Sequence, residues 1–281
     1  MHTNIKKTII KTVLITGASG GLGKEIALYF SKKNWNVIAT LINIEEATIF
    51  DEYPNISCFE LDVTSTESVE QAATQILNTF HSIDVIINNA GMGYRSFVEL
   101  AEDNKIEAIT KVNWLGVVKM CRAFIPHFRA QKKGQFINIS SIAGSVNLPL
   151  GNFYHSTKHA VESFSECMAY ELRPFNIAVA TVQFGNIPSN FQKNVKKSET
   201  TEIDSYNNMM KKVDAIVQKK TEDNQELLTV ILDKLYHIAE NPSKGFKKYA
   251  VGFDAHFMIS LRRIVGYRIF NFIIRNAILK K

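Results

Sequence analysis

Cysteine is scarce in this sequence, and its distribution argues against two kinds of site. The chain has three cysteines, Cys58, Cys121 and Cys167, which are odd in number and far apart. A zinc site or a disulfide framework would place cysteines in close, paired spacing. His155 and His159 have no cluster of cysteines or carboxylates with them either. We therefore expect no bound metal, and a reducing, cytoplasmic compartment.

The N-terminal segment, MHTNIKKTII, lacks a long apolar run. It contains two lysines and only a short apolar stretch before Lys11. That stretch is too short for the core of a signal peptide or for a membrane span. We expect a protein that is not exported.

Charge is not concentrated in any one part of the chain. The sequence has 33 lysines and arginines against 27 acids, which gives a net charge of +6. Scattered basic residues are typical of a solvated surface, so we expect no nucleic-acid partner. The 46% hydrophobic and 21% charged residues predict a globular chain with a sizeable core.

Short apolar runs rich in β-branched residues alternate with longer segments of helical period. This alternation predicts a buried parallel sheet with helices between the strands. The strand candidates are Thr12–Thr16, Asn36–Leu41, Ile56–Leu61, Ile83–Asn88, Gln135–Ser140, Ile177–Gln183 and Phe246–Val251. We predict an α/β protein in which residues 1–281 form a single Rossmann domain with a doubly wound, seven-stranded parallel sheet flanked by helices.

Two later segments differ from this pattern. Residues 189–223 are polar and lysine-rich, which is typical either of a mobile substrate flap or of a tolerated surface insertion. Residues 254–281 predict a helical extension that is apolar with interspersed basic residues. The basic residues are Arg262, Arg263, Arg268, Arg275, Lys280 and Lys281.

The C-terminal extension allows two interpretations. It could be a basic amphipathic helix that lies on a membrane surface, or it could pack on the domain or against a second subunit. Its apolar stripe is imperfect, because Arg268 and Arg275 share a face while Arg262 and Arg263 do not, and Gly266 interrupts the run.

A glycine-rich turn follows the first strand and opens a helix. In this order, glycines let backbone N–H groups approach a pyrophosphate, which the helix dipole favours. We expect this turn to bind a nicotinamide dinucleotide. The candidate residues are Gly17, Ser19, Gly20, Gly21, Leu22 and Gly23.

The end of the second strand normally selects between the two nicotinamide cofactors. An acid there binds the ribose 2′-OH, whereas a basic residue favours a 2′-phosphate. The stretch Thr40-Leu41-Ile42-Asn43 contains neither. Because no carboxylate repels the phosphate, and Thr40 and Asn43 could donate hydrogen bonds, we expect NADP slightly in preference to NAD.

Tyr154 and Lys158 stand four residues apart, so on a helix they share one face. A free phenol has a pKa of about 10, which a nearby ammonium and an oxidised nicotinamide would lower enough for proton transfer. Tyr29 and Lys33 have the same spacing, but they follow the glycine turn. Ser141 ends a predicted strand thirteen residues before Tyr154, at the sheet edge where ligands bind.

These motifs together resemble those of the short-chain dehydrogenase/reductase family. TGxxxGxG, NNAG, a helical Asn, a Ser and YxxxK appear in order from Thr16 to Lys158. The resemblance implies a catalytic set of Asn113, Ser141, Tyr154 and Lys158, in which Asn113 helps to hold a water for a proton relay. It implies that Lys158 also holds the nicotinamide ribose.

The same resemblance extends the cofactor site. It implies that Asp62 and Val63 contact the adenine ring, although a helix cap or a turn would equally explain Asp62. It implies further cofactor contacts from Asn89, Ala90, Gly91, Gly185, Ile187 and Ser189. Phe184 and Ser189 depart from the usual Pro and Thr of that last loop.

The resemblance implies hydride transfer between the cofactor and a carbonyl or alcohol, with Tyr154 moving the proton and Ser141 stabilising the oxygen. The apolar loop from Ile142 to Phe153 predicts a lipophilic ketone, aldehyde or alcohol, as for hydroxysteroid and retinol dehydrogenases. We expect a homo-oligomer, dimeric or tetrameric. The alternatives are a non-catalytic NAD(P)-binding scaffold of the same fold, or a sugar-nucleotide epimerase or dehydratase, enzymes that tend to be longer than this chain of 281 residues.

Overall fold

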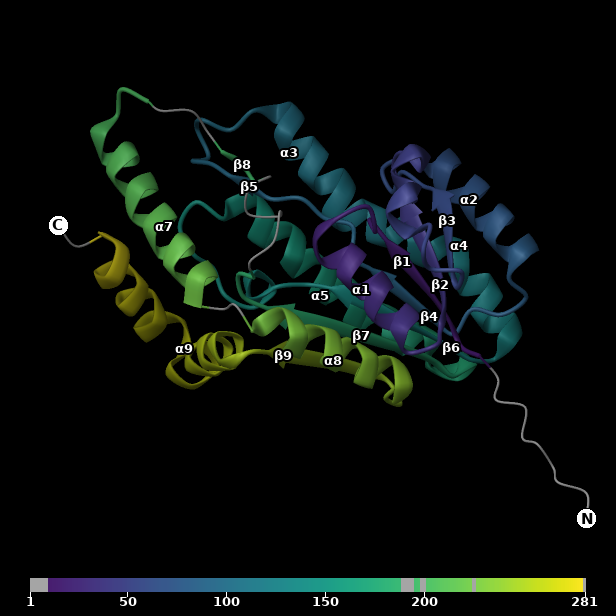
Figure 1. Ribbon diagram of the computed structural model, residues 1–281. Helices are drawn as coiled ribbons and strands as arrows, with labels where there is room; N and C mark the ends of the chain where they lie inside the picture. Colours follow the sequence, from purple (N-terminus) through teal and green to yellow (C-terminus); the bar gives the residue numbers. More distant parts are fainter. Residues whose placement is uncertain (1–9, 188–194, 198–200, 224–225, 280–281) are drawn as a thin grey trace, which may run out of the picture.

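A parallel sheet of seven strands forms the centre of the protein (Figure 1). The computed structural model describes residues 10–187, 195–197, 201–223 and 226–279. The strand order is β3-β2-β1-β4-β6-β7-β9, and each neighbouring pair is parallel. The strands are β1 (Thr12–Thr16), β2 (Asn36–Leu41), β3 (Ile56–Glu60), β4 (Val85–Asn88), β6 (Gly134–Ile139), β7 (Ile177–Phe184) and β9 (Phe246–Val251). The predicted seven-stranded, doubly wound sheet is confirmed, with strand ends displaced by two residues at most.

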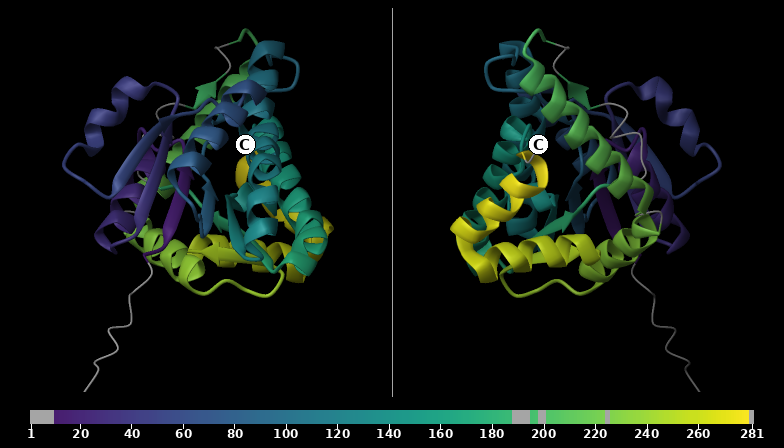
Figure 2. Two further views of the ribbon diagram at one scale, coloured as in Figure 1. Left: turned by 90° about the vertical axis from the view of Figure 1, so that its right-hand side faces the viewer. Right: turned by 90° about the vertical axis from the view of Figure 1, so that its left-hand side faces the viewer.

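Helices cover both faces of the sheet, as Figure 2 shows. One apolar cluster joins the sheet to α1 (Gly21–Lys32) and α8 (Leu227–Glu240). A second cluster, on the other face, joins it to α2 (Thr66–Thr79), α4 (Gly116–Gln131) and α5 (Asn152–Leu172). Every residue of β1 and β7 is buried, because helices shield both sides of these central strands. That is why the sequence reads as continuous apolar runs there.

Shorter elements connect these layers. They are the 3₁₀ turns η1 (Ile44–Phe50), η3 (Ile142–Gly144) and η4 (Arg173–Phe175), the π-helical turn η2 (Lys111–Leu115), and the helix α3 (Asp103–Thr110). A two-stranded sheet of β5 (Tyr94–Arg95) and β8 (Lys196–Lys197) was not predicted from the sequence, because two-residue strands leave no periodic signal.

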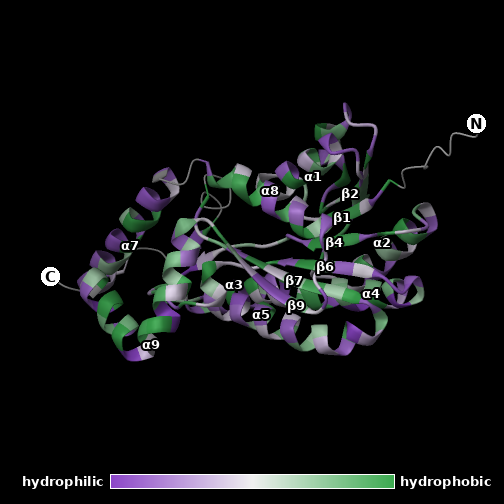
Figure 3. Cartoon of the chain, turned by 90° about the horizontal axis from the view of Figure 1, so that it is seen from below, coloured by the Kyte–Doolittle hydropathy of each residue, from purple (hydrophilic) through white to green (hydrophobic). Residues whose placement is uncertain are grey.

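Two helices, α7 (Asp204–Asp223) and α9 (Phe253–Leu279), lie together at the end of the molecule away from the N-terminus (Figures 1 and 3). The described part of segment 189–223 is therefore mostly helical. Asp214 anchors α7 through ion pairs with Arg95 at 2.7 Å and Lys197 at 2.9 Å. Residues 189–194 and 198–200 of the segment lie outside the described residues.

Gly266 bends α9 with a φ of 70°, so the interruption predicted from the sequence is present. Glycine suits this position because its left-handed backbone is strained for other residues. In the described ranges, no helix combines the length and hydropathy that a membrane crossing requires.

Candidate active site

Close backbone contacts make two glycines of the first turn obligatory. A Cβ on Gly23 would lie 2.1 Å from the Gly17 carbonyl oxygen, and a Cβ on Gly17 would lie 3.0 Å from the Cα of Ala90. Gly17 also has a φ of 68°. The turn after β1 therefore packs directly onto the segment after β4, which brings Asn89, Ala90 and Gly91 to the same edge of the sheet.

The start of α1 is open to a ligand. A Cβ on Gly20 or Gly21 would meet nothing within 4 Å, and no side chain accepts a hydrogen bond at this helix cap. The first backbone N–H groups of a helix need acceptors, and an anionic pyrophosphate supplies them. Ser19 is exposed and Leu22 half-buried beside them. These residues fit a dinucleotide phosphate as predicted.

The segment after β4 is fixed by hydrogen bonds to β1. The Thr16 hydroxyl oxygen accepts from the backbone N–H groups of Asn89 and Ala90, both at 3.0 Å. The Asn89 amide donates to the carbonyl oxygens of Thr16 and Gly17, at 2.9 and 3.2 Å. Next to them, Asn88 donates to Asn138 across β4 and β6 at 2.8 Å. These hydrogen bonds tie the segment to the centre of the sheet.

Thr40 does not have the role predicted for it. Its side chain is fully buried, and its hydroxyl donates to the Ile15 carbonyl at 3.2 Å, so it is not presented to a phosphate. Asn43 is exposed and caps η1 by accepting from the Glu45 N–H at 3.0 Å. The expected preference for NADP at this strand end therefore depends on Asn43 and on the absence of a carboxylate.

Asp62 and Val63 follow β3 in a tight turn. Asp62 accepts hydrogen bonds from the backbone and hydroxyl of Thr64, at 2.8 and 2.9 Å, so the turn role considered from the sequence is real. Ser65, not Asp62, caps α2. Val63 is buried and fits against Gly116, where a Cβ would come within 2.9 Å of it. Contact of this pair with adenine remains a prediction.

Tyr154, Lys158 and Ser141 come together at the carboxyl edge of the sheet. Tyr154 and Lys158 lie one turn apart on α5, and the Lys158 Nζ lies 5.8 Å from the centroid of the Tyr154 ring. The same Nζ donates to the Ile139 carbonyl at the end of β6, at 2.8 Å. Ser141, two residues beyond that carbonyl, hydrogen-bonds the Tyr154 hydroxyl. The Tyr-Lys face and the serine predicted from the sequence therefore form one group.

Burial dominates the acid–base behaviour of this pair in the protein chain itself. It raises the pKa of Tyr154 to about 12, and the hydrogen bond between Ser141 and Tyr154 opposes the rise. It also lowers the pKa of Lys158 to about 8, against the attraction of Glu162. The sequence predicted a lowered phenol pKa, with an oxidised nicotinamide as part of the cause. Lowering the Tyr154 pKa thus requires the charge that the cofactor brings.

Asn113 is fully buried in the π-helical turn η2, where the sequence predicted an ordinary helix. Its Oδ1 accepts from the Met92 N–H at 2.8 Å, and its Nδ2 donates to the Met92 carbonyl at 2.9 Å and to the Thr157 hydroxyl at 3.2 Å. The side chain therefore ties the segment after β4 to α5. Both Nδ2 hydrogens are donated to these partners, so the Asn113 side chain has none left to donate to a relay water. Such a water would have to bind the backbone of Asn113.

Glu162 belongs to this site and was missed from the sequence. It is buried on α5, one turn beyond Lys158, and accepts from the Thr181 hydroxyl at 2.9 Å. Its charge favours the protonated form of Lys158. The signal was available, because Tyr154, Lys158 and Glu162 follow each other at four-residue intervals on one helix face.

The carboxylate of Asp254, in the first turn of α9, lies against the loop after β7. Phe184 accepts a hydrogen bond from the Ser141 hydroxyl at 3.4 Å. A Cβ on the next residue, Gly185, would lie 2.0 Å from an Asp254 carboxylate oxygen, so glycine leaves room for that carboxylate. Ile187 is buried. Ser189, also predicted to contact the cofactor, lies outside the described residues.

The two histidines of α5 are engaged in local hydrogen bonds. His155 Nδ1 pairs with the Val146 carbonyl at 2.7 Å, and His159 Nδ1 with the His155 carbonyl at 2.9 Å. Burial lowers the pKa of His155 to about 4, so it stays neutral near pH 7 and is a poor proton donor there. Within the described residues, no group of three or more His, Cys, Asp or Glu side chains could hold a metal.

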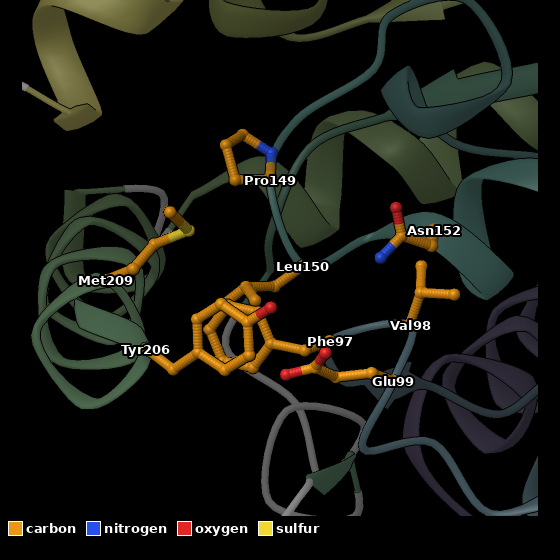
Figure 4. Close-up of a pocket in the computed structure, with 8 residues that line it drawn as sticks. All are labelled: Phe97, Val98, Glu99, Pro149, Leu150, Asn152, Tyr206 and Met209. Carbon is orange, nitrogen blue, oxygen red and sulfur yellow. The ribbon is translucent and has the colours of Figure 1, made fainter. Parts of the chain in front are cut away.

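An apolar pocket of about 440 Å³ opens beside the N-terminal end of α5 (Figure 4). Tyr206 and Met209 of α7 form one wall, and the ring of Tyr206 stacks on Phe97 with centroids 3.8 Å apart. Asn152, two residues before Tyr154, lies on its rim. The full lining is Phe97, Val98, Glu99, Pro149, Leu150, Asn152, Tyr206 and Met209.

Comparison with known proteins shows which family has a similar sequence. The model of the short chain dehydrogenase family matches residues 11–200. A 3-ketodihydrosphingosine reductase from Bacteroides thetaiotaomicron is 40% identical over 189 residues, which cover 67% of this chain and 68% of that protein.

Solved structures share the fold. A short-chain dehydrogenase from Streptomyces avermitilis superposes with a TM-score of 0.82 at 27% identity, covering 92% of this chain and 94% of that one. The protein ElxO, solved with NADP bound, superposes with a TM-score of 0.71 at 27% identity, covering 86% of this chain and 98% of that one.

Proposed function

Because the chain belongs to the short-chain dehydrogenase family and is a nicotinamide-dependent oxidoreductase, we propose that it reduces the ketone of a long-chain lipid that carries an amine next to the carbonyl, with NADPH as the hydride donor. The observation that carries the lipid part is the apolar pocket beside α5. The similar protein named a 3-ketodihydrosphingosine reductase points to the same class of amino ketone.

The chain's own residues account for the proton in this reaction. NADPH, when bound, supplies a hydride to the carbonyl carbon. Tyr154 donates its proton to the carbonyl oxygen, so the ketone becomes an alcohol. Ser141 donates a hydrogen bond to the same oxygen as its negative charge develops. The Lys158 ammonium stabilises the phenolate that Tyr154 becomes, until solvent returns the proton.

Asp254 supports the choice of an amine-bearing substrate. Its carboxylate lies against Gly185, next to the Phe184 carbonyl that accepts from Ser141. We propose that an ammonium on the carbon beside the ketone pairs with this carboxylate. An ion pair of this kind would orient the ketone and select against lipids without the amine.

The choice of NADPH has independent support. No acid stands at Thr40 to Asn43, where a carboxylate would repel a 2′-phosphate. ElxO, which has a similar structure, was solved with NADP bound.

The cellular setting is part of the proposal. The three cysteines are free thiols, which supports a cytoplasmic location. We also propose that the chain forms a homo-oligomer, the commonest kind of assembly among soluble proteins. Light scattering on the purified chain tests the oligomer. We further propose that the C-terminal segment contacts a membrane surface.

The test of the reaction follows nicotinamide absorbance with four ketones. They are long- and short-chain 2-amino-3-ketones and the N-acetyl derivative of each, which removes the positive charge. We expect NADPH to be oxidised faster than NADH, and the free amines to be reduced about tenfold more efficiently than their N-acetyl derivatives. If none of the four ketones caused NADPH to be oxidised, the proposal would be contradicted.

A further inference from the structure

Exposed apolar side chains concentrate on α9. Seventeen large hydrophobic side chains are exposed in the described part of the chain, and seven of them belong to this one helix. Phe253 is 85% exposed and Ile264 is 82% exposed. Isolated exposed hydrophobics are common, but a group on one helix marks an interaction surface. The seven residues are Phe253, Phe257, Ile264, Tyr267, Ile269, Phe272 and Ile273.

Beyond the Gly266 bend, α9 is apolar on two sides. Phe270 and Ile278 are buried, and with Ile274 they form the side that packs on the protein. Ile269, Phe272 and Ile273 fall on the opposite side by helical spacing, and all three are exposed. We call Ile269, Phe272 and Ile273 the outer face.

The charges around the outer face have one sign. Arg268 and Arg275 flank it and are exposed, and Arg263 is exposed on the preceding turns. After Asp254 the sequence contains no aspartate or glutamate, and it ends in Lys280-Lys281. Two copies of this part of the helix would repel each other, because beyond Asp254 neither copy carries an acid to pair with these cations. A surface of lipid phosphates provides the complementary charge.

We propose that α9 docks on an anionic lipid bilayer, with the outer face in the acyl-chain boundary and the arginines at the phosphates. An amphipathic helix with this arrangement lies in the plane of the interface. The bend at Gly266 turns the second half of the helix relative to the first.

The docked helix adjoins the lipid pocket. Ile278 and Ile274 of α9 pack in the same apolar cluster as Phe97 and Leu150, which line the pocket. Val213 of α7 completes the cluster. A long-chain ketone leaving the bilayer beside α9 would therefore be adjacent to an apolar cluster that also borders the pocket. This delivery step depends on the proposed function, whereas docking itself does not.

The binding test uses the full chain and sedimentation with vesicles. We expect vesicles rich in phosphatidylglycerol to bind the protein about tenfold more strongly than pure phosphatidylcholine, and added salt to weaken the binding. Replacing the outer face together, with Ile269→Ser, Phe272→Ser and Ile273→Ser, should reduce binding by about tenfold or more. These side chains are exposed, so the variant keeps its packed core.

A matched control replaces exposed hydrophobics on other elements, with Ile42→Ser, Tyr170→Ser and Val230→Ser. It should bind vesicles as the unmodified protein does. Equal losses in the two triple variants, or no vesicle binding by the unmodified chain, would overturn docking. A dimer that the outer-face variant alone dissociates, without vesicle binding, would identify a second copy as the occupant and overturn it too.

The delivery test compares a long-chain amino ketone in vesicles with a short-chain, water-soluble analogue. The outer-face variant should lose about tenfold in rate on the first and keep its rate on the second. If the outer-face variant lost the same factor in rate on both substrates, or lost none on either, the delivery step would be overturned. If the unmodified protein reduces neither ketone but still binds anionic vesicles, the proposed function fails and docking stands.

Discussion

The surroundings of Lys158 and of Phe272 show how differently two regions of this protein are built. Lys158 is 5% exposed, and it lies among polar groups whose partners span β6, α5 and β7. Phe272 is 68% exposed, on a helix whose outer side is apolar. The first region holds charges and protons in one geometry, while the second is the surface that we propose docks on a lipid bilayer. If so, chemistry and membrane docking depend on separate parts of the chain, which mutations can separate.

The largest effect should come from Tyr154→Phe, which removes the proton donor and keeps the ring. We expect kcat for ketone reduction to fall about 10³-fold while NADPH binding stays unchanged, measured by turnover and by fluorescence titration of the cofactor.

Tyr29→Phe is the matched control, because Tyr29 has a lysine at the same spacing but hydrogen-bonds Asp233 on α8. Its turnover should match that of the unmodified enzyme. Comparable losses in both variants would mean that Tyr154 acts only through packing.

Lys158→Met should lower kcat by about 10²-fold, because the phenolate loses its neighbouring ammonium.

The Lys158→Met substitution should also change how the free energy of unfolding depends on pH. The pKa of Lys158 is about 8 in the folded protein, whereas an ordinary lysine has a pKa of 10.5, so between these values the unfolded chain binds the extra proton. Stability of the unmodified protein therefore gains a contribution as pH rises from about 8 to 10.5.

The measurement is the difference in free energy of unfolding between the two proteins across that pH range. The difference should shift in favour of the unmodified protein as pH rises. A pH-independent difference would show that the pKa of Lys158 is not lowered in the folded protein.

Gly23→Ala should weaken NADPH binding by about tenfold to 10²-fold, because its Cβ would lie 2.1 Å from the Gly17 carbonyl oxygen and displace the turn. Lys32→Ala, an exposed position at the opposite end of α1, serves as control. Calorimetric titration with NADPH compares the two. Equal affinities would argue against the phosphate cradle.

The smallest effect should come from Asp254→Asn, which changes charge and keeps the acceptor for the Ala255 N–H. We expect kcat/KM for the amine-bearing ketone to fall about fivefold, as for a half-exposed ion pair, with no change for its N-acetyl derivative. A loss of NADPH affinity in place of this selective loss would assign Asp254 to the cofactor.

The sequence predicted the buried region better than the exposed one, for physical reasons. Buried parallel strands need continuous apolar runs, and a phosphate turn needs glycine, so both leave local signals. Thr40 could not be assigned, because its burial depends on pairing with β1. The π-turn at Asn113 adds no residue type that would reveal it.

The C-terminal helix was ambiguous for a different reason. Its sequence shows an imperfect apolar stripe because α9 has two apolar sides, one packed through Phe270 and one exposed through Phe272. A periodic pattern cannot separate two opposed apolar faces. Segment 189–223 resembled a loop because α7 contributes only a few apolar side chains, such as Met209 and Val213, to the protein.

The central claim is that Tyr154 becomes acidic only when the positive nicotinamide joins Lys158 beside it. Nuclear magnetic resonance of ring-labelled tyrosine tests this directly, with Tyr154→Phe used to assign the signal. In the protein chain alone the phenol should keep its proton well beyond pH 10, in line with a pKa of about 12, and with NADP⁺ bound it should titrate at least one to two pH units lower. A titration curve that NADP⁺ binding leaves unchanged would contradict the account.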